Sequence, residues 1–287
     1  MQFSINDFTL LEVRNSQKRE IVDYGIKMVG APLEWTETMG KGIKVGIIDT
    51  GIDLKHEDLK YRVREVINTT SSNRKDVTDK NGHGTHVAGI IAAEKNGVGV
   101  VGVAPESDLY IVKAFKDDGL ADFEAIKEGI AWLIEKRVDV INMSFSSKST
   151  LPEYQKIINE AYTRGISLVC AAGNDGYGAD LNTDTIEYPA KFDETIAVIA
   201  VDINERRADF SAVGLRAEIA AAGKNIYSCF PSNKYAVLSG TSMAAPIITG
   251  AVAILQAKAM NRYKRKLTPS EIKLILQIYT ENLGKKG

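Results

Sequence analysis

From residue 44 onward, short apolar and β-branched runs alternate with segments in which apolar residues recur every three or four positions. A run that is nearly continuously apolar, rather than alternating, is typical of a strand buried on both faces of a parallel sheet. The spacing of three and four is that of amphipathic helices. This order predicts an α/β fold with a central, mostly parallel sheet flanked by helices. The runs are residues 45–48, 109–112, 138–143, 167–171 and 195–201, and the clearest helical segments are 123–136 and 152–164.

Length and charge exclude several classes of protein. The chain has 287 residues, of which 44% are hydrophobic and 25% charged, so it is globular rather than disordered. Its net charge is −1, so no overall field attracts nucleic acid or an anionic membrane. Its first residues lack the apolar core of a secretory signal, and its apolar stretches fall short of the ~20 residues that span a bilayer. We therefore expect a cytoplasmic protein that binds neither nucleic acid nor membrane.

Polar and glycine-rich segments follow the predicted strands or open the predicted helices, where α/β proteins hold their ligands. A serine attacks a carbonyl only when a neighbouring base takes its proton, and an acceptor behind that base must hold it in one tautomer. Asp49 ends the first buried strand, His83 begins one helix and Ser242 begins another. These residues predict catalysis by a serine nucleophile, with one of His83 and His86 facing the cleft.

Three motifs, in the order Asp, His, Ser, resemble the subtilisin family of serine proteases over residues 24–267, most closely its intracellular members. They are Asp49-Thr50-Gly51, His83-Gly84-Thr85-His86-Val87-Ala88-Gly89 and Gly240-Thr241-Ser242-Met243-Ala244-Ala245-Pro246. The resemblance implies a three-layer fold and a serine endopeptidase that acts on polypeptides through an acyl-enzyme. It also implies His83 as the base, His86 as a structural neighbour, and Asn174 as a side-chain oxyanion donor beside the main-chain N–H of Ser242. A catalytically silent subtilase that binds or regulates is the alternative from another class.

The resemblance further implies a structural calcium ion at the loop that follows the His83 helix. Calcium takes six to eight oxygen ligands, and a glycine-rich loop supplies several of them as main-chain carbonyls. A tight surface loop without an ion is the alternative. The implied ligands are the carbonyls of Glu94, Val98 and Val100 and the side chains of Asn96, Asp58 and Glu20.

The chain departs from the family where the family usually has Ser-Leu-Gly-Gly, a segment that pairs with the substrate backbone and walls the pocket for the residue before the scissile bond. Here the segment is Ser144-Phe145-Ser146-Ser147, so we expect a narrower cleft. Alignment on Tyr188-Pro189 puts Glu187 at the pocket floor, and Asp175 follows the oxyanion residue. Because a buried charge needs a partner, these two acids predict a preference for Lys or Arg at the cleavage position. Two solvated acids on an exposed loop are the alternative.

The remaining expectations concern the ends of the chain and its role. We expect a peptidase domain over residues 21–287, with a family element missing at its C-terminus, and a short extension over residues 1–20. The extension is expected to inhibit its own enzyme and to be removed near Arg19, after Lys18-Arg19. An oligomer is compatible with the sequence. Two roles stay open: general turnover of intracellular protein, and removal of the leader from a ribosomally made peptide such as a lantibiotic.

Overall fold

A seven-stranded parallel sheet runs through the centre of the protein in the computed structural model, which describes residues 1–5, 8–15, 18–180 and 182–283. Its strand order is β10-β9-β8-β7-β3-β5-β4, and every neighbouring pair is parallel. The strands are β3 Lys44–Asp49, β4 Val63–Asn68, β5 Asp108–Lys113, β7 Val140–Met143, β8 Ser167–Ala171, β9 Thr195–Val201 and β10 Ile219–Ala222.

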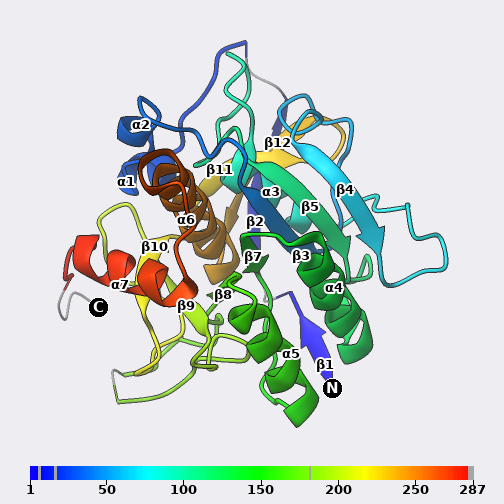
Figure 1. Cartoon of the computed structure of the whole chain (residues 1–287), viewed down its shortest axis with the longest axis vertical. Coiled ribbons are helices and arrows are strands. Elements are labelled where there is room, and N and C mark those ends of the chain that lie inside the picture. The colour runs from blue at the N-terminus through cyan, green and yellow to red at the C-terminus, as the bar shows by residue number, and fades with distance from the viewer. Residues whose placement is uncertain (6–7, 16–17, 181, 284–287) are drawn as a thin grey trace.

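Helices cover both faces of this sheet, as Figure 1 shows. Successive residues of β3 face opposite ways, so Ile47 joins the hydrophobic core on one face and Ile48 the core on the other. Two cores around one sheet make three layers, and the predicted α/β fold is confirmed. Helices α3 His83–Ala92 and α6 Thr241–Tyr263 contribute to the first core, and α4 Phe123–Lys136 and α5 Pro152–Thr163 to the second. The remaining helices are α1 Tyr24–Met28, α2 Ala31–Glu34 and α7 Pro269–Tyr279.

Helix α6 is the central helix of the first core. It is long and apolar enough to cross a membrane, but 78% of its most apolar window is buried inside the protein. The helix also begins one residue before Ser242, so this core element carries the candidate nucleophile. Burial inside the fold therefore accounts for its apolar composition.

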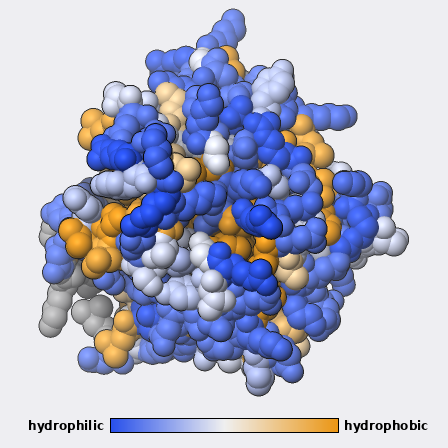
Figure 2. All heavy atoms as spheres, viewed as in Figure 1, coloured by the Kyte–Doolittle hydropathy of each residue, from blue (hydrophilic) through white to orange (hydrophobic). Residues whose placement is uncertain are grey.

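Helix α7 shows a mixed surface. Ile272 is buried on its inner side, whereas Leu274 and Ile278 are 55% and 64% exposed. Figure 2 shows an apolar patch over this helix on a face that is otherwise largely hydrophilic. The helix therefore packs on the domain with one face and presents apolar side chains on the other.

The N-terminal extension forms two strands that the sequence did not predict. Strand β1 Gln2–Ser4 pairs antiparallel with β6 Leu120–Asp122. Strand β2 Thr9–Asn15 adds antiparallel to β12 Lys234–Ser239, which forms a hairpin with β11 Ile226–Phe230. Every residue of β2 is exposed, so main-chain pairing rather than side-chain packing holds it.

Candidate active site

Three neighbouring strands end at the candidate site. Asp49 is the last residue of β3, Ser144 directly follows β7, and Asn174 comes three residues after β8. Because β7 lies between β3 and β8, the carboxyl ends of the three strands meet at one edge of the sheet. The strand order thus assembles residues that are far apart in the sequence.

The imidazole of His83 and the carboxylate of Asp49 form a hydrogen bond. His83 Nδ1 lies 2.8 Å from Asp49 Oδ1, and both side chains are fully buried. The next residue, Gly84, packs directly on the strand end, where a Cβ would lie 2.2 Å from the carbonyl oxygen of Gly51. Only glycine allows the first turn of α3 to approach β3 this closely.

A buried carboxylate that sequence analysis missed, Asp79, fixes the start of α3. Its Oδ1 accepts hydrogen bonds from the N–H of Gly82 at 2.8 Å and the hydroxyl of Thr50 at 2.9 Å. Its Oδ2 accepts from the N–H and the hydroxyl of Thr85, at 2.9 and 2.6 Å. An aspartate just before a predicted helix is a capping signal, so its position in the sequence offered a clue.

Ser242 is the second residue of α6, and its hydroxyl donates to the carbonyl oxygen of Ser144 at 3.0 Å. The hydroxyl of Ser144 in turn donates to the carbonyl of Ser242 at 2.9 Å, and Asn142 Nδ2 donates to that hydroxyl at 2.8 Å. Within the part of the chain that the structure describes, His83 Nε2 has no hydrogen-bond partner. The hydroxyl of Ser242 must therefore rotate away from Ser144 before it bonds to His83, and such tightening on substrate binding is common in active sites.

The amide of Asn174 is oriented by Thr241. Its Oδ1 accepts hydrogen bonds from the N–H and the hydroxyl of Thr241, at 3.0 and 2.9 Å. This leaves the Nδ2 group on the opposite side of the amide, beside Gly240, where an added Cβ would lie 3.4 Å from it. An amide donor and the first N–H groups of α6, which have no intrahelical acceptors, therefore meet at one place.

The other two of the chain's three histidines lie outside this arrangement. Nε2 of His86 lies 3.1 Å from the carbonyl oxygens of both Ile226 and Ala236, and burial lowers the pKa of His86 to about 3. His56 Nε2 lies 2.9 Å from the carbonyl oxygen of Lys234. Both histidines bond to main-chain carbonyl oxygens away from Asp49, so the structure brings His83 rather than His86 to the carboxylate of Asp49.

The segment that begins at Ser144 faces the buried acid Glu187. Glu187 is only 9% exposed, accepts a hydrogen bond from the hydroxyl of Ser146, and lies against Gly173. Burial raises the pKa of Glu187 above its ordinary value, although the Ser146 hydroxyl opposes this. Asp175 departs from the expectation of a second pocket acid: its side chain is 54% exposed and pairs with Lys148 at 2.5 Å. Glu187 is therefore buried beside the segment 144–147, whereas Asp175 lies at the surface.

The N-terminal extension pairs with the segment that begins at Ser144. The N–H of Ser4 donates to the carbonyl of Ser146 at 3.1 Å and the reverse bond has the same length, while the N–H of Ile5 donates to the carbonyl of Gly119 at 3.0 Å. Phe3 is buried, with its ring 5.7 Å from Phe145 and 5.1 Å from Tyr154, edge to face in both cases. The expected substrate-pairing segment thus pairs with the chain's own N-terminus.

Beyond positions 6 and 7, the extension contacts His83. The ring of Phe8 lies 5.2 Å from the ring of His83. The described residues on either side of positions 6 and 7 therefore flank the triad. In this arrangement His83 and Ser242 are both fully buried.

The expected calcium ligands converge at one loop. Asp58 is buried, and its carboxylate accepts hydrogen bonds from Asn96 Nδ2 at 2.9 Å, from the N–H of Val100 at 3.0 Å and from the hydroxyl of Tyr235 at 2.9 Å. Glu20 Oε1 accepts from the N–H of Gly97 at 3.0 Å in the same loop. Burial raises the pKa of Asp58, and no lysine or arginine among the described residues pairs with it. A buried carboxylate beside an oxygen-rich loop suits a hard cation.

The remaining implied ligands belong to the same loop. The N–H of Glu94 donates to the carbonyl of Asp58 at 2.8 Å, and the Glu94 side chain pairs with Arg62 at 3.0 Å. The carboxylate of Glu94 is therefore engaged by Arg62, while its main chain bonds to Asp58. The N–H of Val98 donates to Asn96 Oδ1 at 3.0 Å, which holds the amide in the turn.

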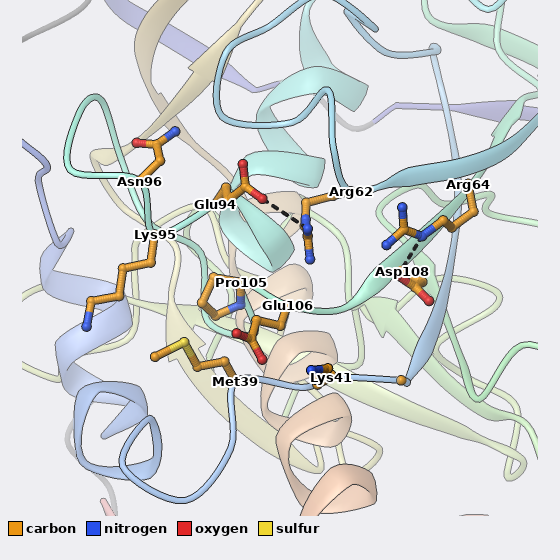
Figure 3. Close-up of a pocket in the computed structure, with 11 residues that line it drawn as sticks. Met39, Lys41, Arg62, Arg64, Glu94, Lys95, Asn96, Pro105, Glu106 and Asp108 are labelled. Atoms are coloured by element: carbon orange, nitrogen blue, oxygen red, sulfur yellow. Dashed lines mark hydrogen bonds and ion pairs between the residues drawn. The ribbon is translucent and has the colours of Figure 1, made fainter.

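A cavity of about 680 Å³ lies beside this loop rather than at the triad. Figure 3 shows charged side chains of both signs around it, including the Arg62–Glu94 pair and the Arg64–Asp108 pair at 2.7 Å. None of the candidate catalytic or pocket residues lines it. The main charges of this cavity thus compensate one another, and it takes no part in the arrangement around Ser242.

Comparisons with known proteins agree with this geometry. The model of the subtilase family, Peptidase S8, matches residues 40–286. An intracellular serine protease of Paenibacillus polymyxa is 40% identical, over 91% of this chain and 80% of the relative. The major intracellular serine protease of Bacillus subtilis (strain 168) is 42% identical, over 86% and 79%, and subtilisin DY of Bacillus licheniformis is 43% identical, over 92% and 93%.

Proposed function

Because this chain belongs to the subtilase family and is a subtilisin-type serine protease, we propose that Asp49, His83 and Ser242 hydrolyse peptide bonds through an acyl-enzyme. The observation that carries the assignment is the buried 2.8 Å bond between His83 Nδ1 and Asp49 Oδ1, with Nε2 left to act as a base. Ser242 stands at the start of α6, which packs on the helix that begins with His83. A catalytically silent relative has no need of this arrangement.

The chemistry follows from these positions. The hydroxyl of Ser242 turns from Ser144 to His83 Nε2, gives up its proton and attacks the substrate carbonyl. Asp49 stabilises the imidazolium that forms, and His83 then passes the proton to the leaving amine. The Nδ2 group of Asn174 and the N–H of Ser242 hold the developing oxyanion. Water releases the acyl group by the same steps in reverse.

Peptide hydrolysis by the wild type and by Ser242→Ala tests the proposal directly. The wild type should cleave internal bonds and bind a fluorophosphonate at Ser242, and the variant should do neither. A wild type that binds peptides without cleaving or being labelled would contradict it, and would support the silent alternative.

We further propose that the enzyme prefers Lys or Arg at the residue before the scissile bond. Support comes from Glu187, a buried acid beside the segment 144–147; the two lysines that act on its pKa, Lys148 and Lys191, form their ion pairs with Asp175 and Asp184 instead. An incoming cation would supply the missing charge. Asp175, being exposed and paired with Lys148, contributes at most weakly.

Calcium is the proposed structural ion. Asp58, Asn96, Glu20 and the carbonyls of the loop at residues 94–100 would hold it, and it would neutralise a buried carboxylate. The hydrogen bonds that gather these groups support the site. An ion that joins residues 20, 58 and the loop would also tie the end of the extension to the domain.

The extension is the proposed inhibitor of its own enzyme. Its residues 2–5 pair along both walls of the cleft, where a substrate is expected to lie. Lys18 and Arg19 are exposed and follow β2. Because the cleft of the same molecule is filled by its own residues, we expect removal of the extension to be carried out by a second molecule.

The proposed setting is the cytoplasm, as the relatives named intracellular serine proteases suggest. The charged pocket and the Ser146 side chain in its wall favour limited processing after a basic residue, including release of a leader from a ribosomally made peptide. The relatives favour general turnover. Digestion of an unfolded protein distinguishes these roles, since limited processing predicts a few fragments that end in Lys or Arg, and turnover predicts many short ones.

A further inference from the structure

The contact between β2 and β12 shows what the outer edge of β12 accepts. The pairing is antiparallel and extends from Thr9 opposite Ser239 to Asn15 opposite Lys234, with one irregularity between Val237 and Leu238. All seven residues of β2 are exposed, so their side chains contribute little. A main chain of almost any sequence could therefore occupy this edge, proline excepted.

The direction of the extension connects this edge to the catalytic residues. Ser4 pairs with Ser146 on one side of the triad, the ring of Phe8 lies against His83, and Thr9 pairs with Ser239, three residues before Ser242. A polypeptide whose acyl half lies where Gln2–Ser4 lies continues past His83 in the same direction. Its following residues then arrive at β12.

We propose that the outer edge of β12 is a docking strand for the substrate segment that follows the scissile bond, over about the length of β2. This inference rests on the proposed protease function and adds its substrate class: long, extended polypeptides, bound through their main chain after the extension has left. An unpaired strand edge presents a row of N–H and C=O groups that readily pairs with another chain. Short peptides reach the triad but gain nothing from this edge.

The test uses the full chain with β2 weakened. Val13, in β2, is 42% exposed and lies opposite Ala236, so Val13→Pro weakens the strand through its fixed φ and missing N–H without disturbing the core, and Val13→Thr is the matched control. Two substrates share the residues before the scissile bond and carry two or ten residues after it. A handful of added hydrogen bonds should raise kcat/KM about 10-fold for the long substrate with the Val13→Pro enzyme. Equal values for the two substrates would overturn the proposal.

A third substrate distinguishes the effect of main-chain pairing with β12 from the effect of a longer tail. Its ten-residue tail carries proline at alternate positions, so it keeps the length and loses donors. It should behave like the two-residue tail, whereas a tail of scrambled sequence without proline should behave like the original. A proline tail that is cleaved as well as the original would overturn strand addition.

This design tests the docking proposal and the inhibition proposal independently. If Val13→Pro and Val13→Thr cleave the short substrate at the same rate, the extension is not an inhibitor held by β2. The ratio of kcat/KM between the long and short substrates is therefore also measured after residues 1–19 have been removed, so that the edge of β12 is uncovered whichever way that comparison falls.

Discussion

Replacing Glu187 by glutamine removes a charge from the proposed specificity pocket and leaves its shape and its hydrogen bond with Ser146 nearly unchanged. Glu187 is 9% exposed, so a cation that reaches it forms a largely desolvated, charge-assisted bond. Such bonds contribute about 1.5–3 kcal/mol, which is about 10- to 150-fold in kcat/KM. We expect Glu187→Gln to lose that factor for arginine substrates and to keep its rate for methionine substrates.

The assay compares kcat/KM for two peptides that differ only in arginine or methionine before the scissile bond. Asp175→Asn is the matched control, because this exposed acid should change the ratio by less than about 3-fold. An unchanged ratio in Glu187→Gln, or a wild type that prefers large apolar residues, would refute the placement of the charge.

The preference for the arginine peptide over the methionine peptide should also depend on pH. Burial raises the pKa of Glu187, so its carboxylate is ionised only above a pH higher than that of an ordinary glutamate. The preference for arginine should be present above that pKa and should disappear as the pH falls through it. The ratio of the two kcat/KM values isolates this effect, because protonation of the catalytic histidine affects both substrates alike. A ratio that stays constant down to the ordinary glutamate range would contradict the burial of the charge.

Four further outcomes are expected. Asn174→Leu should lower kcat by about 10²–10³ with little change in KM, a magnitude taken from subtilisin itself rather than from the distances here. Calcium at 100 times its dissociation constant should stabilise the protein by about 2.7 kcal/mol, or roughly 5–10 °C in Tm, and Asp58→Asn should abolish that shift in a thermal melt. Phe3→Ser should raise the activity of the full chain by about 10- to 100-fold, because the burial that holds the extension is lost, whereas Leu11→Ser, at an exposed site, should not. Mass spectrometry of active enzyme should find a new N-terminus after Arg19, at a rate that rises with protein concentration; an intact chain with full activity would argue against removal.

The central sheet could be predicted because its signal is local. In the strand Ser167–Ala171 every residue after the initial serine is apolar, so the sequence alone indicates burial on both faces. Strand β2 gives no such signal, since its residues are exposed and its partner lies more than two hundred positions away. Pairing at that distance is set by tertiary structure, which propensity does not contain.

Some residues of the candidate site could likewise be predicted from local sequence, and others only from the tertiary structure. Asp49, His83 and Ser242 stand in recognisable motifs, whereas Asp79 and Asn142 act through neighbours that only folding brings close. Whether Glu187 and Asp175 are buried or exposed also depends on the path of the backbone, which the sequence alone does not show. Gly173 turns the chain with φ of 115°, and Asp175, two residues later, points to solvent although it adjoins the oxyanion residue.

The burial of α6 has a consequence for the lifetime of the enzyme. Proteases digest chains that open locally, and segments with few buried contacts open at the lowest free energy. Here the candidate nucleophile stands on a helix whose residues are mostly buried, while β2 and Arg19 lie at the surface. A segment that a second molecule can reach is therefore the one whose loss we expect to activate the enzyme. Opening of the α6 turn that carries Ser242 should require global unfolding. Hydrogen exchange of the amides in this turn should therefore report how long the mature protease resists digestion by other molecules of the same enzyme.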